Sequence, residues 1–129
     1  MAVEITCTVR GPVLAIPFEK IAKDILGKNH SLSLVLSGDK LTRKINRTYR
    51  KKDYPANVLS FSLSKNEGEI FLNVRKAERE AKVAGISARA RIALLFIHGC
   101  LHLRGFRHGT AMEKLERNTL KKFGFHPVT

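Results

Sequence analysis

A continuous apolar run is the feature that most constrains how this 129-residue chain can fold. Residues 92–97 contain almost no polar side chain, which predicts a helix that is buried on nearly all sides. The run continues through His98 and His102, and their spacing of four residues places both on one face of that helix. Gly105 favours a left-handed helix end, after which the chain can turn back and bring His108 beside the other two histidines.

Three imidazoles that meet at one point, with a fourth position open, are typical of catalytic zinc. A single histidine near an apolar helix is more often a hydrogen-bonded core residue. Here, however, three of the five histidines fall within one short run, so we predict a metal site formed by His98, His102 and His108. In zinc proteases of the His-Glu-x-x-His type, the general base directly follows the first histidine. Gly99 occupies that position, which argues against peptide hydrolysis.

The length and the hydrophobic content of 43% predict one domain, residues 1–129, with a real core. Residues 1–10 lack the basic start and apolar block of a signal peptide, and no apolar run approaches the length of a membrane span. We therefore expect a cytoplasmic protein with no membrane partner. The two cysteines show no pairing signature, and we expect Cys100 to be a buried, reduced thiol on the side of the helix away from the histidines.

The charge of the chain indicates a polyanionic partner. Lysine and arginine number 24 against 11 acidic residues, a formal net charge of +13, and nucleic acid explains this excess best. Six basic residues crowd one short segment and favour contact with phosphates, although a solvated helix face explains most of them equally well: Arg43, Lys44, Arg47, Arg50, Lys51 and Lys52. We interpret Tyr54, which precedes Pro55, as a turn aromatic rather than a base-stacking surface.

The polarity pattern predicts strands at residues 4–9, 31–37, 58–63 and 70–72, with a turn at 66–68. It predicts helices from Pro17 to residue 26, from an Asp39 cap through Tyr49, over 74–84, and from Ser87 through the apolar run. A last helix follows a capping box at residues 110–113 and ends at Gly124. The order β-α-β-α-β-β-α-α-α indicates an α+β fold (an α/β sandwich), a small mixed four-stranded sheet covered by about five helices.

Four segments together resemble the YbeY family of rRNA-maturation endoribonucleases. They are HGCLHLRGFRH at residues 98–108, INRTYRKKDYPANVLSF at 45–61, GEIFL at 68–72 and MEKLE at 112–116. The resemblance extends from about residue 30 to the end of the chain. It implies a mixed sheet flanked by helices, with zinc held by His98, His102 and His108 at the mouth of a basic cleft. It also selects Arg50 from the basic segment as a functional residue.

The resemblance implies cleavage of single-stranded RNA in small-subunit rRNA maturation and ribosome quality control. Many family members have Asp where this chain has Arg107, Asp where it has Glu69, and Thr where it has Ala56. These departures remove no ligand. Arg107 places a cation beside the third histidine, which lowers metal affinity or favours phosphate binding.

Our leading hypothesis is therefore an enzyme, a zinc-dependent endoribonuclease with one Zn²⁺ per chain. Three neutral imidazoles leave zinc dipositive, so the pKa of a bound water falls to about 7. Two routes are open: the hydroxide attacks phosphorus, or it deprotonates the ribose 2′-OH. Arg50 would stabilise the phosphorane charge, while the RNA backbone would be held by Arg43, Lys44, Arg47 and Lys51. Nickel or copper would also fit three histidines.

Two other functions compete with this hypothesis. The first is a non-catalytic RNA- or ribosome-binding assembly factor with a structural metal, although structural zinc usually has four protein ligands. The second is a metallo-hydrolase acting on a small substrate, which fits the histidines but leaves the charge of +13 unexplained. His30 and His126 lie outside the motif, and we assign them no role.

Overall fold

The fold is built on one mixed sheet with the strand order β1-β2-β4-β3. The computed structural model describes residues 1–9 and 15–125, so His126 lies outside it. The strands are β1 (Ala2–Cys7), β2 (Ser31–Ser37), β3 (Val58–Ser64) and β4 (Glu67–Asn73). The helices are α1 (Phe18–Leu26), α2 (Asp39–Arg50), α3 (Val74–Ala84), α4 (Ala88–Leu103) and α5 (Thr110–Lys122). The predicted α+β class and element order are confirmed.

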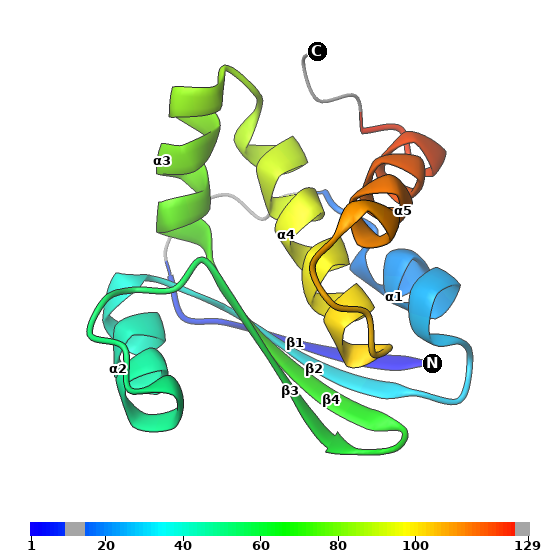
Figure 1. Cartoon of the computed structure of the whole chain (residues 1–129), viewed down its shortest axis with the longest axis horizontal. Helices are drawn as coiled ribbons and strands as arrows, with labels where there is room; N and C mark the ends of the chain where they lie inside the picture. Colours follow the sequence, from blue (N-terminus) through cyan, green and yellow to red (C-terminus); the bar gives the residue numbers. More distant parts are fainter. Residues whose placement is uncertain (10–14, 126–129) are drawn as a thin grey trace.

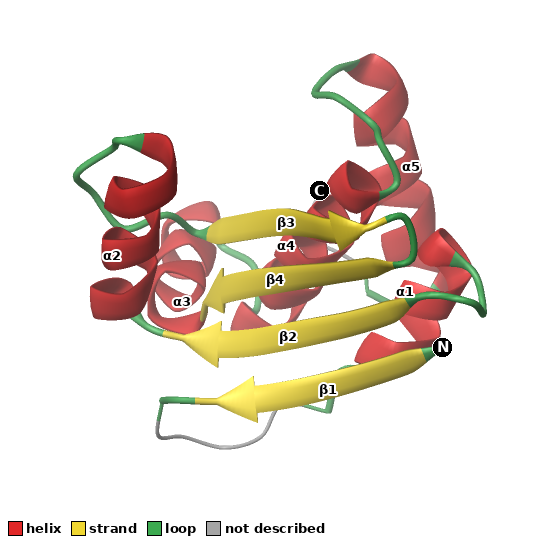
Figure 2. Ribbon diagram, turned by 90° about the horizontal axis from the view of Figure 1, so that it is seen from below, coloured by secondary structure: helices red, strands yellow, loops and turns green. Residues whose placement is uncertain are grey.

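The alternation of side chains along the strands divides the core between the two faces of the sheet. β1, β2 and β4 run parallel, and β3 pairs antiparallel with β4 at the edge. Leu34 and Ile70 are fully buried in the main core, which α4 covers with α1, α3 and α5 packed around it (Figure 1). On the opposite face, Ile45 of α2 packs with Leu59 in a smaller cluster, and α2 lies beside the end where β3 begins (Figure 2).

The central helix α4 is buried as the apolar run predicts. Ile92, Phe96 and Ile97 are fully buried, and the Phe96 ring meets Phe18 of α1 edge to face at 4.9 Å. Cys100 is a free, fully buried thiol, and burial raises its pKa well above its usual range, so it stays protonated. Among the described residues no single helix is long and apolar enough to cross a membrane; only α3 and α4 taken together meet that test, and they are bent by 118°.

Two predicted strand boundaries are wrong, because pairing between strands decides them rather than local polarity. β1 begins at Ala2 and ends at Cys7, since its parallel register with β2 starts at Ser31. The predicted turn at residues 66–68 is shorter than expected. Parallel pairing with Ser31 recruits Glu67 into β4, which leaves a turn of two residues, 65 and 66.

Two predicted helix caps are also wrong. α2 has Gly38 as its N-cap, so Asp39 is the first helical residue rather than the cap. The Asp39 carboxylate instead accepts hydrogen bonds from Asn73 and Arg79, which lie 34 and 40 residues away in the sequence. Similarly, α5 has Gly109 as its N-cap, so Thr110 is the first helical residue rather than the cap. In both cases the helix begins one residue earlier than the cap pattern indicates.

Asn73 joins four segments at the carboxyl end of β4. Its fully buried side-chain amide donates to Asp39 at 2.8 Å, to Thr42 at 3.0 Å and to the backbone oxygen of Ala56 at 3.3 Å. Its side-chain oxygen accepts from the Lys76 backbone N–H and caps α3. Hydrogen bonds from Arg79 and Asn73 hold the pKa of Asp39 below its usual range, so the anionic acceptor persists at neutral pH.

We predict that Asn73→Ala lowers the free energy of unfolding by about 2–4 kcal/mol, because it removes a helix cap and leaves buried partners unsatisfied. Chemical denaturation monitored by circular dichroism measures the change. The matched control is Asn118→Ala on the exposed side of α5, for which we expect a change within about 0.5 kcal/mol. Equal stabilities of the two variants would contradict the role given to Asn73.

Candidate metal centre

The helix α4 places His98 and His102 where it crosses the β3–β4 hairpin. A Cβ atom at Gly99 would lie 2.9 Å from the Ser60 hydroxyl oxygen and 3.1 Å from Ile70 Cδ1. The Ser60 hydroxyl also donates to the Gly99 carbonyl at 3.1 Å. The position that carries the base in a zinc protease therefore faces the strands at close range and has no room for a catalytic side chain.

The end of α4 turns the chain back toward its own histidines, as the glycine predicts. Gly105 has φ of +105°, and its N–H donates to the His102 carbonyl at 2.9 Å. The Phe106 N–H donates to the Leu101 carbonyl at 3.0 Å. These two bonds form a Schellman motif that ends the helix and directs the next residues back along it. The exposed His108 follows two residues later.

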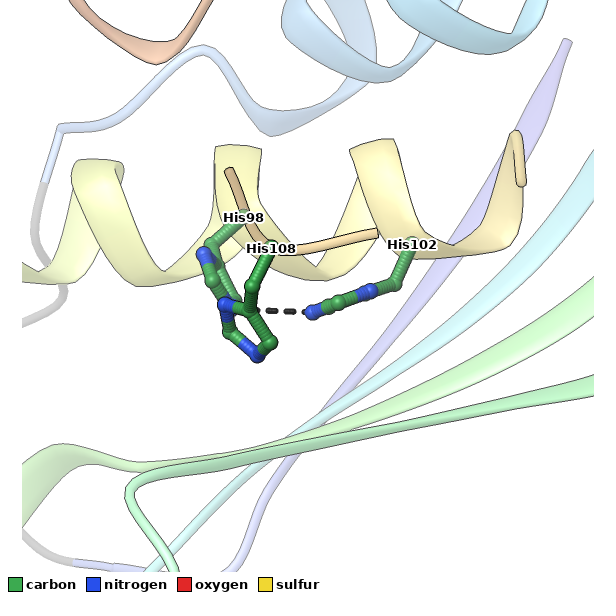
Figure 3. Close-up of side chains that lie close together, drawn as sticks. All are labelled: His98, His102 and His108. Atoms are coloured by element: carbon green, nitrogen blue, oxygen red, sulfur yellow. Dashed lines mark hydrogen bonds between the residues drawn. The ribbon is translucent and has the colours of Figure 1, made fainter. Parts of the chain in front are cut away.

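The three predicted ligands converge on one point (Figure 3). The ring centroids of His98 and His102 are 4.5 Å apart, and the His108 centroid lies 4.9 Å and 4.8 Å from them. One nitrogen from each ring falls within 4.8 Å of the others. His98 and His102 come from α4, whereas His108 comes from the loop before α5, so helix, turn and loop are all required to assemble the group.

Hydrogen bonds at the far side of two rings fix which nitrogen faces the centre. His98 Nδ1 lies 2.6 Å from a carboxylate oxygen of Glu116, to which it donates. His102 Nδ1 lies 3.0 Å from the Phe106 carbonyl oxygen, which only accepts. Both Nε2 atoms therefore present lone pairs toward the centre. Glu116 belongs to α5, and its side chain is only 14% exposed. The packing of α5 therefore holds the carboxylate next to His98.

The two Nε2 atoms lie 3.0 Å apart (dashed line in Figure 3). Two neutral acceptors at this distance repel each other unless a cation or a proton lies between them. Ligands of a tetrahedral zinc ion with Zn–N bonds of 2.0–2.1 Å are about 3.3 Å apart. The spacing and the orientation of His98 and His102 therefore fit a metal ion of that size.

The environment of His102 favours the neutral form that a metal requires. Burial lowers its pKa, and the nearby His98 and His108 lower it further, while the Phe106 carbonyl and Glu116 act in the opposite direction. A lowered pKa means that His102 keeps its free lone pair to a lower pH than an ordinary histidine.

The three histidines lie in a cleft with a volume of about 720 Å³. One wall of the cleft is a face of α4 that begins at Arg91 and includes His98 and His102. The opposite wall is formed by residues 57–61, which belong to the edge strand β3 and to the residue before it. Arg50, the last residue of α2, also lines the cleft. The structure therefore brings the predicted catalytic arginine and the three predicted ligands into one site.

The other predicted RNA-binding residues lie on α2 or just after it and do not line this cleft. The guanidinium groups of Arg43 and Arg47 both contact Asp53, at 3.0 and 3.2 Å, on an exposed surface. Lys44 and Lys51 are exposed, and Lys51 ends the helix with φ of +55°. These four side chains therefore form a basic surface next to the cleft.

Sequence reasoning missed two acidic residues that organise the cleft. Glu116 orients His98, although it lies 18 residues away in the sequence. Glu80 of α3 accepts hydrogen bonds from Arg91 at 3.0 and 3.2 Å and holds that arginine against the cleft wall. The signal for Glu116 was the MEKLE segment, in which Glu116 follows the buried Met112 by four residues and so lies on the helix side nearest the core.

A comparison with protein families finds a match that spans the whole cleft region. A family model described as Endoribonuclease YbeY matches residues 13–124, which include all three histidines, Arg50 and Glu116. The chain belongs to the YbeY family.

Individual YbeY relatives agree with this assignment. Endoribonuclease YbeY of Geobacter sulfurreducens is 35% identical over 112 residues, covering 77% of this chain and 75% of the relative. The Helicobacter pylori relative of the same name is 44% identical over 94 residues, covering 70% and 66%. The solution structure of TM1509 from Thermotoga maritima has a TM-score of 0.70 at 21% identity, over 94% of this chain and 88% of that one, which shows that the fold is shared.

We predict that Glu116→Ala lowers the zinc affinity of this YbeY chain about 10- to 100-fold, because His98 loses the partner that fixes its tautomer and orientation. Competition with a chromophoric chelator measures the affinity. The matched control is Glu113→Ala, which removes an exposed carboxylate from the same helix and should leave the affinity unchanged. Wild-type affinity in the Glu116 variant would show that His98 needs no carboxylate partner.

Proposed function

We propose that this chain is a zinc-dependent endoribonuclease that prefers single-stranded RNA. The convergence of three imidazole nitrogens in a cleft that Arg50 also lines is the observation that carries this proposal. Membership of a family whose described relatives are named endoribonucleases supports the reaction class. The net charge of +13 supports a nucleic-acid substrate.

His98, His102 and His108 would hold the ion, and the ion supplies Lewis-acid activation of water. The protein contributes the orientation of the ligands. Glu116 keeps the proton of His98 on Nδ1, and the Phe106 carbonyl does the same for His102. Both Nε2 lone pairs are thus fixed in the direction of the ion before it binds, which is the preorganisation that catalytic metal sites require.

Arg50 would bind the phosphate whose bond is cleaved. A guanidinium group is always charged and donates two parallel hydrogen bonds to phosphate oxygens. Arg50 ends α2 and is exposed on the wall of the cleft that holds the histidines. In this position it would stabilise the extra negative charge that develops on the phosphoryl oxygens in the transition state.

The shape of the site supports a preference for single strands. The cleft volume of about 720 Å³ lies in the range of small-ligand sites, and the side chain of His98 is only 22% exposed within it. A flexible strand would enter such a cleft and turn one phosphate toward the histidines more readily than a rigid duplex.

We further propose that the substrate is rRNA, and that cleavage serves rRNA maturation and ribosome quality control. The basic surface formed by Arg43, Lys44, Arg47 and Lys51 would contact phosphates outside the cleft. Contacts of this kind carry no sequence information, so the cleavage site would be selected by the shape of the ribosomal particle.

A non-catalytic binding factor with a structural metal is the alternative function. Within residues 1–9 and 15–125, three potential ligands converge, and they do so in an open cleft rather than in a closed four-ligand shell. This arrangement favours catalysis.

The proposed function is tested by cleavage of a single-stranded RNA and of the same sequence as a duplex, with zinc-loaded protein. We expect cleavage of the single strand, and a fall of about 100-fold for Arg50→Lys, because lysine keeps the charge but loses the bidentate geometry. The control is Lys20→Ala on α1, which removes one positive charge from an exposed site outside the cleft and should leave the rate unchanged.

A chelator should abolish the activity, and added zinc should restore it. Single-strand cleavage that persists without metal would contradict the role of the three histidines. RNA binding without cleavage under all metal conditions would favour the non-catalytic factor.

A further inference from the structure

We propose that Tyr49 is a stacking site for an unpaired nucleobase beside the cleft. This inference rests on the proposed function and extends it. It names the part of the RNA that binds next to the phosphate held by Arg50, and it assigns the recognition to an aromatic ring rather than to a charge.

The exposure of Tyr49 is the first observation. Its ring belongs to a large apolar side chain, yet the residue is 70% exposed at the end of α2. One side of the ring is supported by Phe61, with ring centroids 5.5 Å apart and planes tilted by 60°. Phe61 in turn meets Phe71 edge to face at 6.1 Å, and both pack against the small core under α2. The Tyr49 ring is therefore supported on one side by Phe61, while most of the residue remains exposed to solvent.

The position of this ring relative to the cleft is the second observation. Tyr49 directly precedes Arg50, which lines the cleft, and its supporting partner Phe61 lines the same cleft. β3, which carries Phe61, is the edge strand of the sheet. A strand of RNA with one phosphate at Arg50 would pass over this edge, and its neighbouring base would reach Tyr49.

The chemistry of such a platform agrees with a single-stranded substrate. Every base has an aromatic face, so stacking binds unpaired bases with little sequence preference. A tyrosine supplies a large contact area and loses little conformational entropy, because only two side-chain torsions must be fixed. The basic side chains nearby would contact the phosphates of the RNA backbone, whereas Tyr49 would contact a base. In a duplex that base is stacked between its neighbours and is not accessible to Tyr49.

Tyr54 provides an internal comparison. It is 50% exposed, and its ring lies 5.6 Å from the Lys76 ammonium group. Neither tyrosine lines the cleft, but Tyr49 contacts Phe61, which does, whereas Lys76 does not. Both tyrosines are thus exposed and differ in position, which makes Tyr54→Ala a matched control for Tyr49→Ala.

The first test is binding of a short single-stranded oligoribonucleotide and of an abasic oligomer of the same length, at fixed salt and with a chelator to prevent cleavage. We expect the wild type, Tyr54→Ala and Tyr49→Phe to bind the base-containing oligomer about 5- to 100-fold more tightly than the abasic one. Tyr49→Ala should bind both oligomers equally, at the affinity that the wild type has for the abasic oligomer.

The second test uses the native ring. The chain has two tyrosines and no tryptophan, so Tyr54→Phe leaves Tyr49 as the source of tyrosine emission. Stacking on a base quenches this emission. We expect quenching by the base-containing oligomer and little change with the abasic one, a result that does not depend on the folding of Tyr49→Ala.

A Tyr49→Ala variant that keeps the preference for bases, or equal quenching by both oligomers, would overturn the stacking site while leaving the proposed endoribonuclease intact. Failure of the wild type to bind either oligomer would instead overturn both proposals.

Discussion

The close crossing of α4 over the β3–β4 hairpin is the constraint on which the rest of the site depends. It requires Gly99, because any side chain there would meet Ser60 and Ile70 at about 3 Å. The Ser60 hydroxyl bonds the helix backbone at the same point and keeps the helix in register with the strand. Since His98 and His102 flank this crossing, their rings emerge beside the β3 edge, where a cleft remains open.

The electrostatics of the site follow from this packing. His98 donates its Nδ1 proton to Glu116, and His102 donates its Nδ1 proton to the Phe106 carbonyl. The Nε2 atoms of the two rings therefore face each other at 3.0 Å. A divalent ion bound between these nitrogens would remove the repulsion between their lone pairs. The protein thereby prepares a cation site inside a basic chain of net charge +13, where phosphates of RNA would be attracted to the surrounding surface.

Local patterns in the sequence predicted the features that depend on neighbouring residues. The apolar run identified α4, the spacing of four identified the shared face of His98 and His102, and Gly105 identified the returning turn. Contacts between residues far apart in the sequence could not be predicted from local patterns. Glu116 reaches His98 only because α5 packs on α4. The Asp39 carboxylate bonds to Asn73 and Arg79 instead of capping α2. Arg50 was selected by family resemblance, since charge alone does not distinguish it from its basic neighbours.

Metal stoichiometry by native mass spectrometry is the measurement that tests the central claim most directly. The untagged wild type is compared with a variant in which His98, His102 and His108 are all alanine, each titrated with zinc and each checked for folding. We expect one ion per wild-type chain and none in the folded variant. A folded wild type that takes up no ion in excess zinc, or a variant that binds as many ions as the wild type, would contradict it.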